Sequence, residues 1–411
     1  MNTCNRIKKV SAKEILDSRD NPTLEVEIVS EKGVFKASVP SGASTGKHEA
    51  IELRDGGKRM NGKGVLRAVK NINEIIGPKL VGKDACNQEE IDRILIRLDG
   101  TKNKSKLGAN ALCGVSLAVC RAGAFRKPLW KHIAQLAGNR KPSLPYPSFN
   151  VINGGSHAKN ELDFQEFMIV PLVRPFSKSF KLGSQVYQQL KESIQEELGK
   201  SSLTIGDEGG FAPLIKKPEK ALGLIFNAAN RIGLQNEIKI IIDVASSQFF
   251  EAVEYRTGFG SFDSKKLVSY YSSLIEKYPI IGIEDGMAEE DWEGWKLMKQ
   301  SFKKLLLIGD DLTVTNKSLV EKAVKAQCAN AMIIKPNQVG TLTETLECVK
   351  AAKEAGWKLI ASHRSGETLD SFIADLAVGI GADFIKSGAP FKKERLAKYE
   401  RLLEIEKEIK K

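Results

Sequence analysis

Short apolar runs in the second part of the chain end on charged residues that could do chemistry. The first three runs, IKIIID, IIGIE and LLLIGD, end on carboxylates, and the next three, AMII, KLIAS and ADFIK, end on or just before cations. In chain order, these closing residues are Asp243, Glu284, Asp310, Lys335, His363 with Arg364, and Lys386. Clustered carboxylates could bind a metal ion, and clustered cations could bind an anion.

The three carboxylates predict a metal site. One aspartate after a strand is usually a helix cap or a turn residue. Three carboxylates that end consecutive strands would converge and repel one another, and a bound cation relieves that repulsion. A set of oxygen ligands without cysteine or histidine favours a hard ion, Mg²⁺ before Mn²⁺ or Ca²⁺. We therefore expect Asp243, Glu284 and Asp310 to hold a divalent cation.

The cations predict an anion site beside the metal. Lys335 and Lys386 end apolar strands, although most lysines are solvated surface groups. The segment His363-Arg364-Ser365-Gly366 adds a fork-shaped guanidinium and a hydroxyl, which suit a phosphate or a carboxylate. The segment GKRMNGKG at 57–64 resembles a phosphate-binding P-loop, but Gly64 replaces the Ser or Thr that such a loop needs.

The spacing of these residues predicts a β/α barrel. The later strand ends recur about every 25 residues, which is the length of one strand, one helix and two loops. Amphipathic segments such as LTETLECVKAAKEAG lie between them. In such barrels the reactive groups sit at the C-terminal ends of the strands. An open, doubly wound sheet is the competing architecture, but the glycine-rich phosphate loop typical of its first strand is missing.

A smaller α+β domain is expected before the barrel. TLEVEIV, SEKG and VFKASV read as strand, turn and strand. Apolar residues at helical spacing follow at 65–76, and residues 107–126 are rich in Ala, Leu and Val. The proline-rich segment GNRKPSLPYPS marks the boundary. We predict an N-terminal α+β domain over 1–136 and a C-terminal TIM-like barrel over 143–411.

The composition is that of a globular, non-membrane protein. With 42% hydrophobic residues, the chain contains no apolar stretch long enough for a signal peptide or a membrane helix. The net charge of +12 is spread along the chain without basic blocks, so nucleic-acid binding is not expected. The six cysteines form no CxxC pair, which favours reduced thiols and a cytoplasmic location.

Many short segments together resemble one family. They are SGASTGKHEA, ELRDG, LDGTKNKSKLGANA, INGGSHA, QEFMIVP, GDEGGFAP, IEDG, GDDLTVTN, KPNQVGT, SHRSGET, IADLAVG and AKYERLLEIE. In number and order they are similar to the enolases along almost the whole chain. The resemblance implies an enolase-type barrel and reversible dehydration of 2-phosphoglycerate to phosphoenolpyruvate in glycolysis and gluconeogenesis. It also implies two Mg²⁺ ions per site and a homodimer or larger homo-oligomer.

The resemblance also implies roles for individual residues. Lys335 would remove the C2 proton to give an enolate, and Glu208, with Glu166 and His157 beside it, would assist departure of the C3 hydroxyl. The phosphate would lie on Arg364 and Ser365, with His363 and Gln165 among the substrate-binding residues, and Lys386 would hold the carboxylate. The metal ligands would be Asp243, Glu284 and Asp310 for the first Mg²⁺, and Ser44 for a second ion that binds with substrate.

The chemistry implied is consistent with these residue types. Loss of a proton next to a carboxylate places a second negative charge there, which fixed cations would stabilise. The same cations should lower the pKa of Lys335 so that it can act as a base. The SGASTG loop, with Gly42 and Gly46 able to act as hinges, has the composition of a lid.

Some positions depart from the enolase pattern. Asp20 replaces a usual glycine in SRDNPT, and Gln248 replaces a usual glutamate near Asp243. KKER replaces RSER near the C-terminus and Glu400 replaces an asparagine, which we expect to concern the surface or subunit contacts. Two other functions remain possible from the sequence: a different acid–base reaction on a carboxylate substrate, and a non-catalytic binding role.

Overall fold

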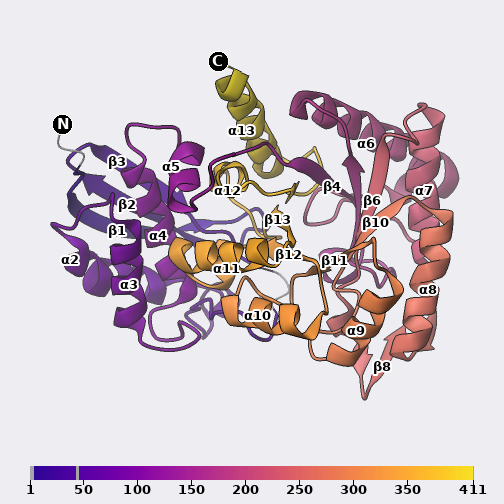
Figure 1. Ribbon diagram of the computed structural model, residues 1–411, viewed down its shortest axis with the longest axis horizontal. Coiled ribbons are helices and arrows are strands. Elements are labelled where there is room, and N and C mark those ends of the chain that lie inside the picture. Colours follow the sequence, from indigo (N-terminus) through magenta and orange to yellow (C-terminus); the bar gives the residue numbers. More distant parts are fainter. Residues whose placement is uncertain (1–3, 43–45, 411) are drawn as a thin grey trace.

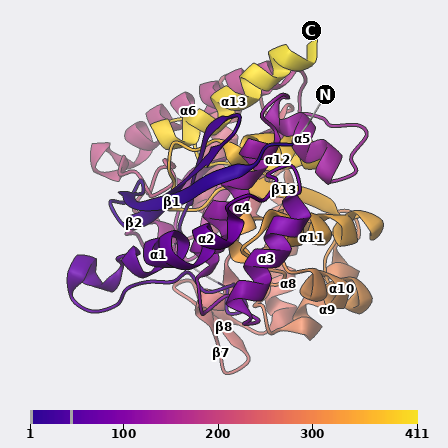
Figure 2. The same ribbon diagram turned by 90° about the vertical axis from the view of Figure 1, so that its left-hand side faces the viewer.

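The N-terminal part of the chain begins with an antiparallel sheet. The computed structural model describes residues 4–42 and 46–410. Within the first of these ranges, β1 (Ile7–Leu16), β2 (Pro22–Ser30) and β3 (Gly33–Ser38) form a three-stranded meander. This confirms the predicted hairpin. Alternate residues of β2, among them Leu24, Val26 and Ile28, are fully buried, and β2 packs against α4 (Ala109–Gly123). Figure 2 shows this part of the molecule facing the viewer.

Helices complete this part of the molecule. They pack beside the sheet at the left of Figure 1. Besides α4, they are α1 (Leu66–Lys70), η2 (Asn71–Ile76), α2 (Gly77–Leu80), α3 (Gln88–Asp99) and α5 (Leu129–Leu136), with a short η1 (Arg59–Gly62) before them. The helical patterns predicted at 65–76 and 107–126 are therefore confirmed.

The second part is a closed barrel, which confirms the predicted fold class (Figure 1). In the described part of the chain its strands are joined in the order β10-β11-β12-β13-β14-β4-β5-β6. Their bounds are β4 (Tyr146–Asn153), β5 (Glu166–Pro171), β6 (Ile238–Asp243), β10 (Ile280–Glu284), β11 (Leu306–Gly309), β12 (Ala331–Ile334), β13 (Lys358–Ser362) and β14 (Phe384–Lys386). The domain bounds 1–136 and 143–411 remain a prediction.

One strand of the barrel runs against the others. β5 pairs antiparallel with both β4 and β6, whereas the remaining neighbours are parallel. The strand rhythm alone does not predict this reversal. Its cause is the connection from β4 to β5, which contains only the short η3 (Gly155–His157). Without a crossover helix the chain cannot return to the other end of the barrel, so β5 must start where β4 ends.

The helices around the barrel follow the strand rhythm. After β5 the chain forms two successive long helices. Each of the following barrel strands, from β6 to β13, is followed by one α-helix before the next barrel strand. The outer helices are α6 (Phe176–Leu198), α7 (Pro218–Arg231), α8 (Ser264–Lys277), α9 (Trp292–Ser301), α10 (Lys317–Ala326), α11 (Leu342–Glu354), α12 (Phe372–Ile380) and α13 (Lys393–Lys410). Smaller elements lie in the loops: η4 (Lys200–Ser202), η5 (Ser246–Phe249), η6 (Pro336–Gln338) and the strands β7 (Phe250–Glu251), β8 (Glu254–Thr257) and β9 (Gly260–Phe262).

Side-chain alternation along the strands decides which residues enter the barrel. The interior is filled by a compact cluster: Met168, Val170, Ile241, Ile308, Ala331, Ile333, Ile360 and Phe384. Residues of opposite parity, such as Ile242, Met332 and Ile385, face the helices. The residue two positions beyond an interior one also points inward. Parity therefore turns the side chains at 243, 310, 335 and 386 toward the barrel axis.

Two other features bear on the sequence analysis. Asp20 adopts a left-handed backbone with φ 57°, and the turn around it is closed by Asp17 N donating to Asn21 O at 2.9 Å. Aspartate therefore forms the turn in which a glycine is usual, at the modest cost of a left-handed non-glycine residue. Over the described residues, none of the helices combines the length and the hydropathy that a membrane span requires.

Candidate active site

A buried lysine lies among three carboxylates at the barrel mouth. Lys386 Nζ is 2.8 Å from Glu284 Oε1, 3.1 Å from Asp243 Oδ2 and 3.0 Å from Glu166 Oε2. Burial would lower the pKa of Lys386, but Glu166 and Glu284 outweigh it and raise this pKa well above its usual value. Burial and Asp243 raise the pKa of Glu284 well above its usual value as well. One ammonium does not balance three carboxylates, so this side retains an excess of negative charge.

Asp310 lies nearby but pairs with a different lysine. Lys335 Nζ donates to Asp310 Oδ2, and Gln338 Nε2 donates to Asp310 Oδ1 at 2.9 Å. Burial would lower the pKa of Lys335, but the Asp310 carboxylate outweighs it, so the pKa is raised. Asp285 shapes the same loop, because its carboxylate accepts from the backbone N–H groups of Asp310 and Asp311. The lowered pKa expected for Lys335 therefore depends on cations that would draw Asp310 away.

A second group on the mouth combines carboxylates with histidines. His157 Nδ1 is 3.3 Å from Glu166 Oε1 and 3.6 Å from Glu208 Oε1. His363 Nε2 is 3.0 Å from Glu208 Oε2, which also accepts from Asn150 Nδ2 at 3.0 Å. Burial would raise the pKa of Glu208, but His363 and His157 lower it well below its usual value. The pKa of Glu166 is raised by burial and by Glu208.

Arg395 fixes the protonation pattern of this second group. Its guanidinium is fully buried, lies 2.6 Å from His363 Nδ1 and donates to the carbonyl oxygens of Arg364 and Ser365. A guanidinium has no acceptor, so His363 Nδ1 must accept and Nε2 must carry the ring proton toward Glu208. Burial lowers the pKa of His363 to about 4, which keeps the ring neutral. Arg395 therefore braces both the Arg364–Ser365 segment and the Glu208 side of the mouth.

KKER departs from RSER at Lys392 and Lys393, which are expected to concern the surface or subunit contacts; Lys393 is exposed, but Lys392 contacts a loop of the site. Lys392 Nζ donates to the carbonyl oxygen of Asp207 at 3.1 Å, directly before Glu208. Gly388 lies against the same loop: its φ is 71°, and a Cβ there would lie 2.5 Å from the Glu208 carbonyl oxygen. Glycine is required at this close approach.

Arg364 already contacts a carboxylate of the chain. Its Nη1 and Nη2 donate to Glu49 at 2.9 and 3.2 Å, and Nη1 also donates to Asn337 Oδ1 at 3.2 Å. Glu49 belongs to residues 46–50, which cross the mouth and are held by Ala50 N donating to the Gln338 carbonyl oxygen. The predicted anion clamp is thus built around a guanidinium that binds a carboxylate in two-pronged geometry.

Gln165 connects Gln248, which replaces the glutamate usual in enolases, to the carboxylate of Asp243. Gln248 Nε2 donates to Gln165 Oε1 at 2.7 Å, and Ser156 Oγ donates to the same atom at 2.7 Å. With its oxygen occupied, Gln165 turns its amide nitrogen toward Asp243 Oδ2, 3.3 Å away. The Gln248 amide thus supports, through Gln165, a hydrogen bond to one of the expected metal ligands.

The loops explain why the strand rhythm missed part of the site. Since β5 is reversed, its first residue, Glu166, lies at the mouth and pairs with Asp243, the last residue of β6. Glu208 comes from the connection between α6 and α7, which is tied to β4 by Phe211 N donating to the Val151 carbonyl oxygen. The sequence predicted no role for Glu49, Gln338, Asn150 or Arg395, although Glu49 lies in SGASTGKHEA near Ser44 and Gln338 lies in KPNQVGT three residues after Lys335.

The Lys335–Asp310 pair lies across the ring from Glu166, which belongs to both of the other groups. In the closed order, β12 is four strands from β5 in either direction, so Lys335 and Glu166 face each other across the mouth. Lys386 ends β14 and Arg364 follows β13, and these two strands lie between β12 and β5 in the ring. The arrangement can hold an anion between a lysine on one side and a carboxylate–histidine group on the other.

The mouth also suits a hard divalent cation. Asp243, Glu284 and Asp310 each have an oxygen next to a lysine Nζ, so a positive centre is already favoured at this position. Among the described residues, two sets of possible ligands come within 4.8 Å of one another: His157 with Glu166 and Glu208, and Asp285 with Asp310 and Asp311. The predicted trio is not one of these tight sets, since the lysines lie between its members. Ser44 lies outside the described residues.

Comparison with known proteins places the chain in a family. Residues 7–133 match the family model described as "Enolase, N-terminal domain", and residues 141–411 match "Enolase, C-terminal TIM barrel domain". The chain belongs to the enolase family. It is 52% identical to Enolase B of Dictyostelium discoideum over 422 residues, covering 98% of this chain and 95% of the relative. It is 48% identical to Enolase 1 of Entamoeba histolytica over 419 residues, covering 98% and 96%.

Membership in the enolase family decides between the functions that the sequence left open. Both relatives match over nearly their entire length and are enolases, so this chain is a phosphopyruvate hydratase, an enzyme of the lyase class. A purely non-catalytic role and a different reaction on the same barrel are thereby set aside.

Proposed function

We propose that this enolase-family protein catalyses the reversible, Mg²⁺-dependent dehydration of 2-phosphoglycerate to phosphoenolpyruvate in glycolysis and gluconeogenesis. The observation that carries the proposal is the opposition of Lys335 and the Glu208 group across one mouth, with Arg364 and Lys386 between them. An elimination that removes a proton from one carbon and hydroxide from the next needs a base and an acid on opposite sides of the substrate. The two full-length relatives support the same reaction.

Lys335 is proposed as the base that takes the C2 proton. In the absence of substrate it is a protonated partner of Asp310. It would act as a base once that partnership weakens, as a cation held by Asp310 would favour. When held by Asp243, Glu284 and Asp310, Mg²⁺ supplies positive charge where the substrate carboxylate gains its second negative charge. We propose that Ser44 contributes to a second Mg²⁺ that binds with substrate.

The Glu208 group is proposed to supply the proton that leaves with the C3 hydroxyl. Glu208 itself has a strongly lowered pKa, whereas Glu166 and His157 have raised pKa values and contact one another. For His157, burial would lower the pKa, and the carboxylates of Glu208 and Glu166 outweigh it. We therefore assign the acid function to the three residues together: His157 and Glu166 hold the proton, and Glu208 delivers it to the leaving oxygen.

Substrate binding follows from the remaining cations. Arg364, with Ser365 and His363 beside it, would hold the phosphate, in place of the Glu49 carboxylate that now occupies the guanidinium. Lys386 would hold the substrate carboxylate, since its ammonium already lies among carboxylates. Gln165 would orient the substrate from the Asp243 side. Residues 46–50, which continue from the SGASTG loop expected to act as a lid, would have to move to admit the phosphate.

The test is an assay of phosphoenolpyruvate formation from 2-phosphoglycerate, with Mg²⁺ present and after its removal by a chelator. We expect turnover with Mg²⁺ and its loss without. A folded, Mg²⁺-loaded protein that forms no phosphoenolpyruvate would refute the proposed reaction, and equal turnover in chelator would refute the metal requirement.

We also propose that the enzyme works in the cytoplasm as a homodimer or larger homo-oligomer, as its resemblance to the enolases implies. Static light scattering of the purified protein tests the assembly, and a mass of one 45.2 kDa chain would contradict it. Subcellular fractionation followed by immunoblotting tests the location.

A further inference from the structure

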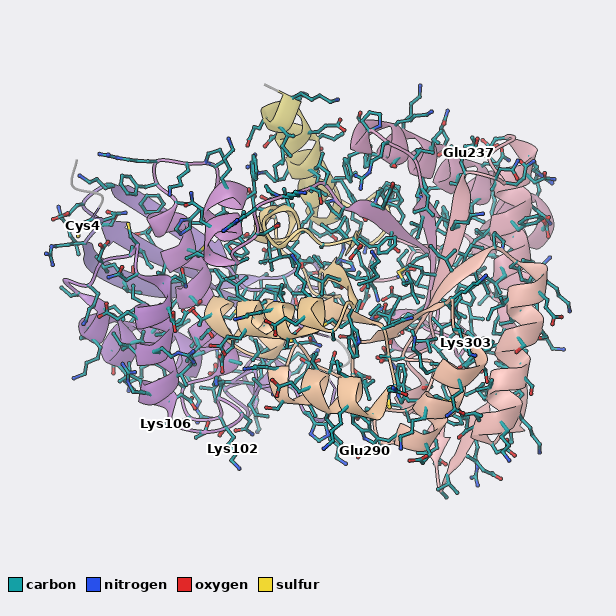
Figure 3. All side chains as sticks on the ribbon, in the orientation of Figure 1. Cys4, Lys102, Lys106, Glu237, Glu290 and Lys303 are labelled. Atoms are coloured by element: carbon teal, nitrogen blue, oxygen red, sulfur yellow. The ribbon has the colours of Figure 1, made fainter. Side chains whose placement is uncertain are left out.

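Cys4, near the start of the chain, and Cys86 lie close together, far from the active site. Residues 5–7 pair antiparallel with residues 83–85, just before α3: Ile7 N donates to Lys83 O at 2.9 Å and Ala85 N to Asn5 O at 3.0 Å. Cys4 directly precedes residues 5–7 and Cys86 directly follows residues 83–85, so both lie at the same end of this pairing. Figure 3 shows Cys4 at the edge of the molecule that is remote from α7 and α8.

Both thiols converge on one carboxylate. The Asp84 side chain is hydrogen-bonded by the thiols of Cys4 and Cys86, and its Oδ1 also accepts from the backbone N–H groups of Asn5 and Cys86. The Cys86 sulfur in turn accepts from the backbone N–H of Asn5. That nitrogen is joined to the carbonyl carbon of Cys4, so the Cys86 sulfur lies next to the backbone that carries the other thiol. The Arg6–Asp84 β-bridge sets an antiparallel register in which residue 4 falls opposite residue 86, the arrangement that a disulfide with Cα atoms about 4.4–6.8 Å apart requires.

We propose that Cys4 and Cys86 are a modification site at which a reversible disulfide joins the N-terminal end of the chain to the segment before α3. The oxidant is a small disulfide such as oxidised glutathione. The Cys4 thiolate attacks one of its sulfurs and expels one thiolate, which leaves a mixed disulfide on Cys4. The Cys86 thiolate then attacks the Cys4 sulfur and expels the second thiolate. The two protons of the protein thiols pass to the two released thiols, so atoms and electrons balance.

The surroundings make this pair distinct from the other cysteines. Cys4 and Cys86 are half-buried, whereas the other four, Cys113, Cys120, Cys328 and Cys348, are buried. A small disulfide reaches the first two without unfolding and does not reach the rest. Closing the chain between residues 4 and 86 would restrict the unfolded state, so the cross-linked form is expected to resist denaturant better.

Asp84 should control the rate of the reaction. Burial and Asp84 raise the pKa of Cys86 to about 11, and burial and Asp84 also raise the pKa of Cys4. Arg6 opposes this increase for Cys4 and Glu31 adds to it. Few thiolates are therefore present near neutral pH, and the reaction should accelerate as the pH rises. Asp84→Asn keeps an acceptor for the backbone N–H groups and removes the negative charge, so it should react several-fold faster than the natural protein.

The experiment incubates the folded, reduced full-length chain with oxidised glutathione, blocks remaining thiols after unfolding, and maps peptides by mass spectrometry without reduction. We expect a peptide pair joined through Cys4 and Cys86, with the other four cysteines blocked as thiols, and a higher urea midpoint for the oxidised protein. Reductant should reverse both. Glutathione that remains on Cys4 or Cys86 without cross-linking, or no reaction at either, would overturn the proposal.

Single-cysteine variants provide the matched controls. Cys4→Ser and Cys86→Ser should each keep glutathione on the remaining cysteine and form no cross-link, because the resolving thiol is missing. A cross-link to a buried cysteine in either variant would show that the folded structure does not select the pair. An Asp84→Asn variant that reacts no faster than the natural protein would contradict the shared contact of both thiols with Asp84.

Discussion

The two sides of the barrel mouth use buried carboxylates in opposite electrostatic settings. On the first side, Glu284 lies among carboxylates that share Lys386, and burial and Asp243 raise its pKa well above the usual value. On the second side Glu208 is equally buried, but His363 and His157 lower its pKa well below the usual value. Burial has the same sign for both residues, so the neighbours decide the difference.

The different balance of charge on the two sides explains why the first side suits a metal ion. Around Glu208 the chain itself supplies a hydrogen-bond donor in the neutral His363 and positive charge in the buried Arg395, with His157, whose pKa is raised, beside them. Around Asp243 and Glu284 it supplies one lysine for several carboxylates, and the deficit is the charge that a divalent cation would provide. With such a cation bound, the first side would stabilise a developing negative charge, whereas the second is suited to hold and release a proton.

The largest expected effect is at Lys335. Lys335→Ala should lower turnover by about 10²–10⁴-fold, the usual contribution of a positioned base, while substrate still binds. Steady-state kinetics and exchange of the C2 proton in deuterated water measure this. The exposed Lys325, changed to Ala, serves as the control. Persistent C2 exchange in the Lys335→Ala protein would remove it from the role of base.

The second side can be tested separately at Glu208. Glu208→Gln should slow dehydration by about 10²-fold while C2 exchange falls less, since the amide keeps the contact but cannot transfer a proton. Comparing the two rates in one preparation measures the split, with the exposed Glu161→Gln as control. If both rates fell equally, the two sides would not have separate roles.

A smaller effect is expected for the metal requirement. Asp310→Asn should raise the Mg²⁺ concentration needed for half-maximal activity by about tenfold or more, because it removes one charged ligand. A Mg²⁺ titration of activity measures the change, and Glu321→Gln on the surface of α10 should leave the titration unmoved. An unchanged titration for Asp310→Asn would exclude Asp310 from the ligands.

The smallest effect concerns a buried histidine in neither group. Burial and Lys127 lower the pKa of His132 to about 4, whereas carboxylates raise that of His157. Because the unfolded chain binds this proton near pH 6.5, the contribution of His132 to stability is present above that pH and is lost as the pH falls toward 4. Between pH 7.5 and pH 5, the free energy of unfolding measured in urea should fall by about 2 kcal/mol more in the natural protein than in the His132→Gln variant. Equal losses in both proteins would mean that His132 is not held neutral by burial.

Most of the barrel could be predicted because its evidence is local. A strand that buries both faces reads as a largely apolar run, and a charged residue marks its end, as at Asp243, Glu284 and Lys386. The reversal of β5 could not be predicted this way, since the strand direction depends on whether the preceding connection contains a helix. Resemblance to the enolases named Glu208 and His157, which no strand pattern marks.

The sequence could not predict which charged side chains contact one another. The pairing of Lys335 with Asp310, of Arg364 with Glu49 and of Arg395 with His363 joins residues far apart in the chain. These contacts set the pKa directions, because a charge acts over a few ångströms and sequence separation does not reveal such distances. The same holds for Cys4 and Cys86, whose common neighbour Asp84 appears only after residues 5–7 pair with 83–85.

The sequence by itself determined the residue types, their places at the strand ends and, through its resemblance, the family. Strand parity is already written in the order of residues, so the inward direction of Asp310, Lys335 and Lys386 follows once the strands are known. Only the tertiary structure decided that one side of the mouth lacks positive charge and the other does not. That balance depends on which side chains the closed ring brings within a few ångströms of each carboxylate.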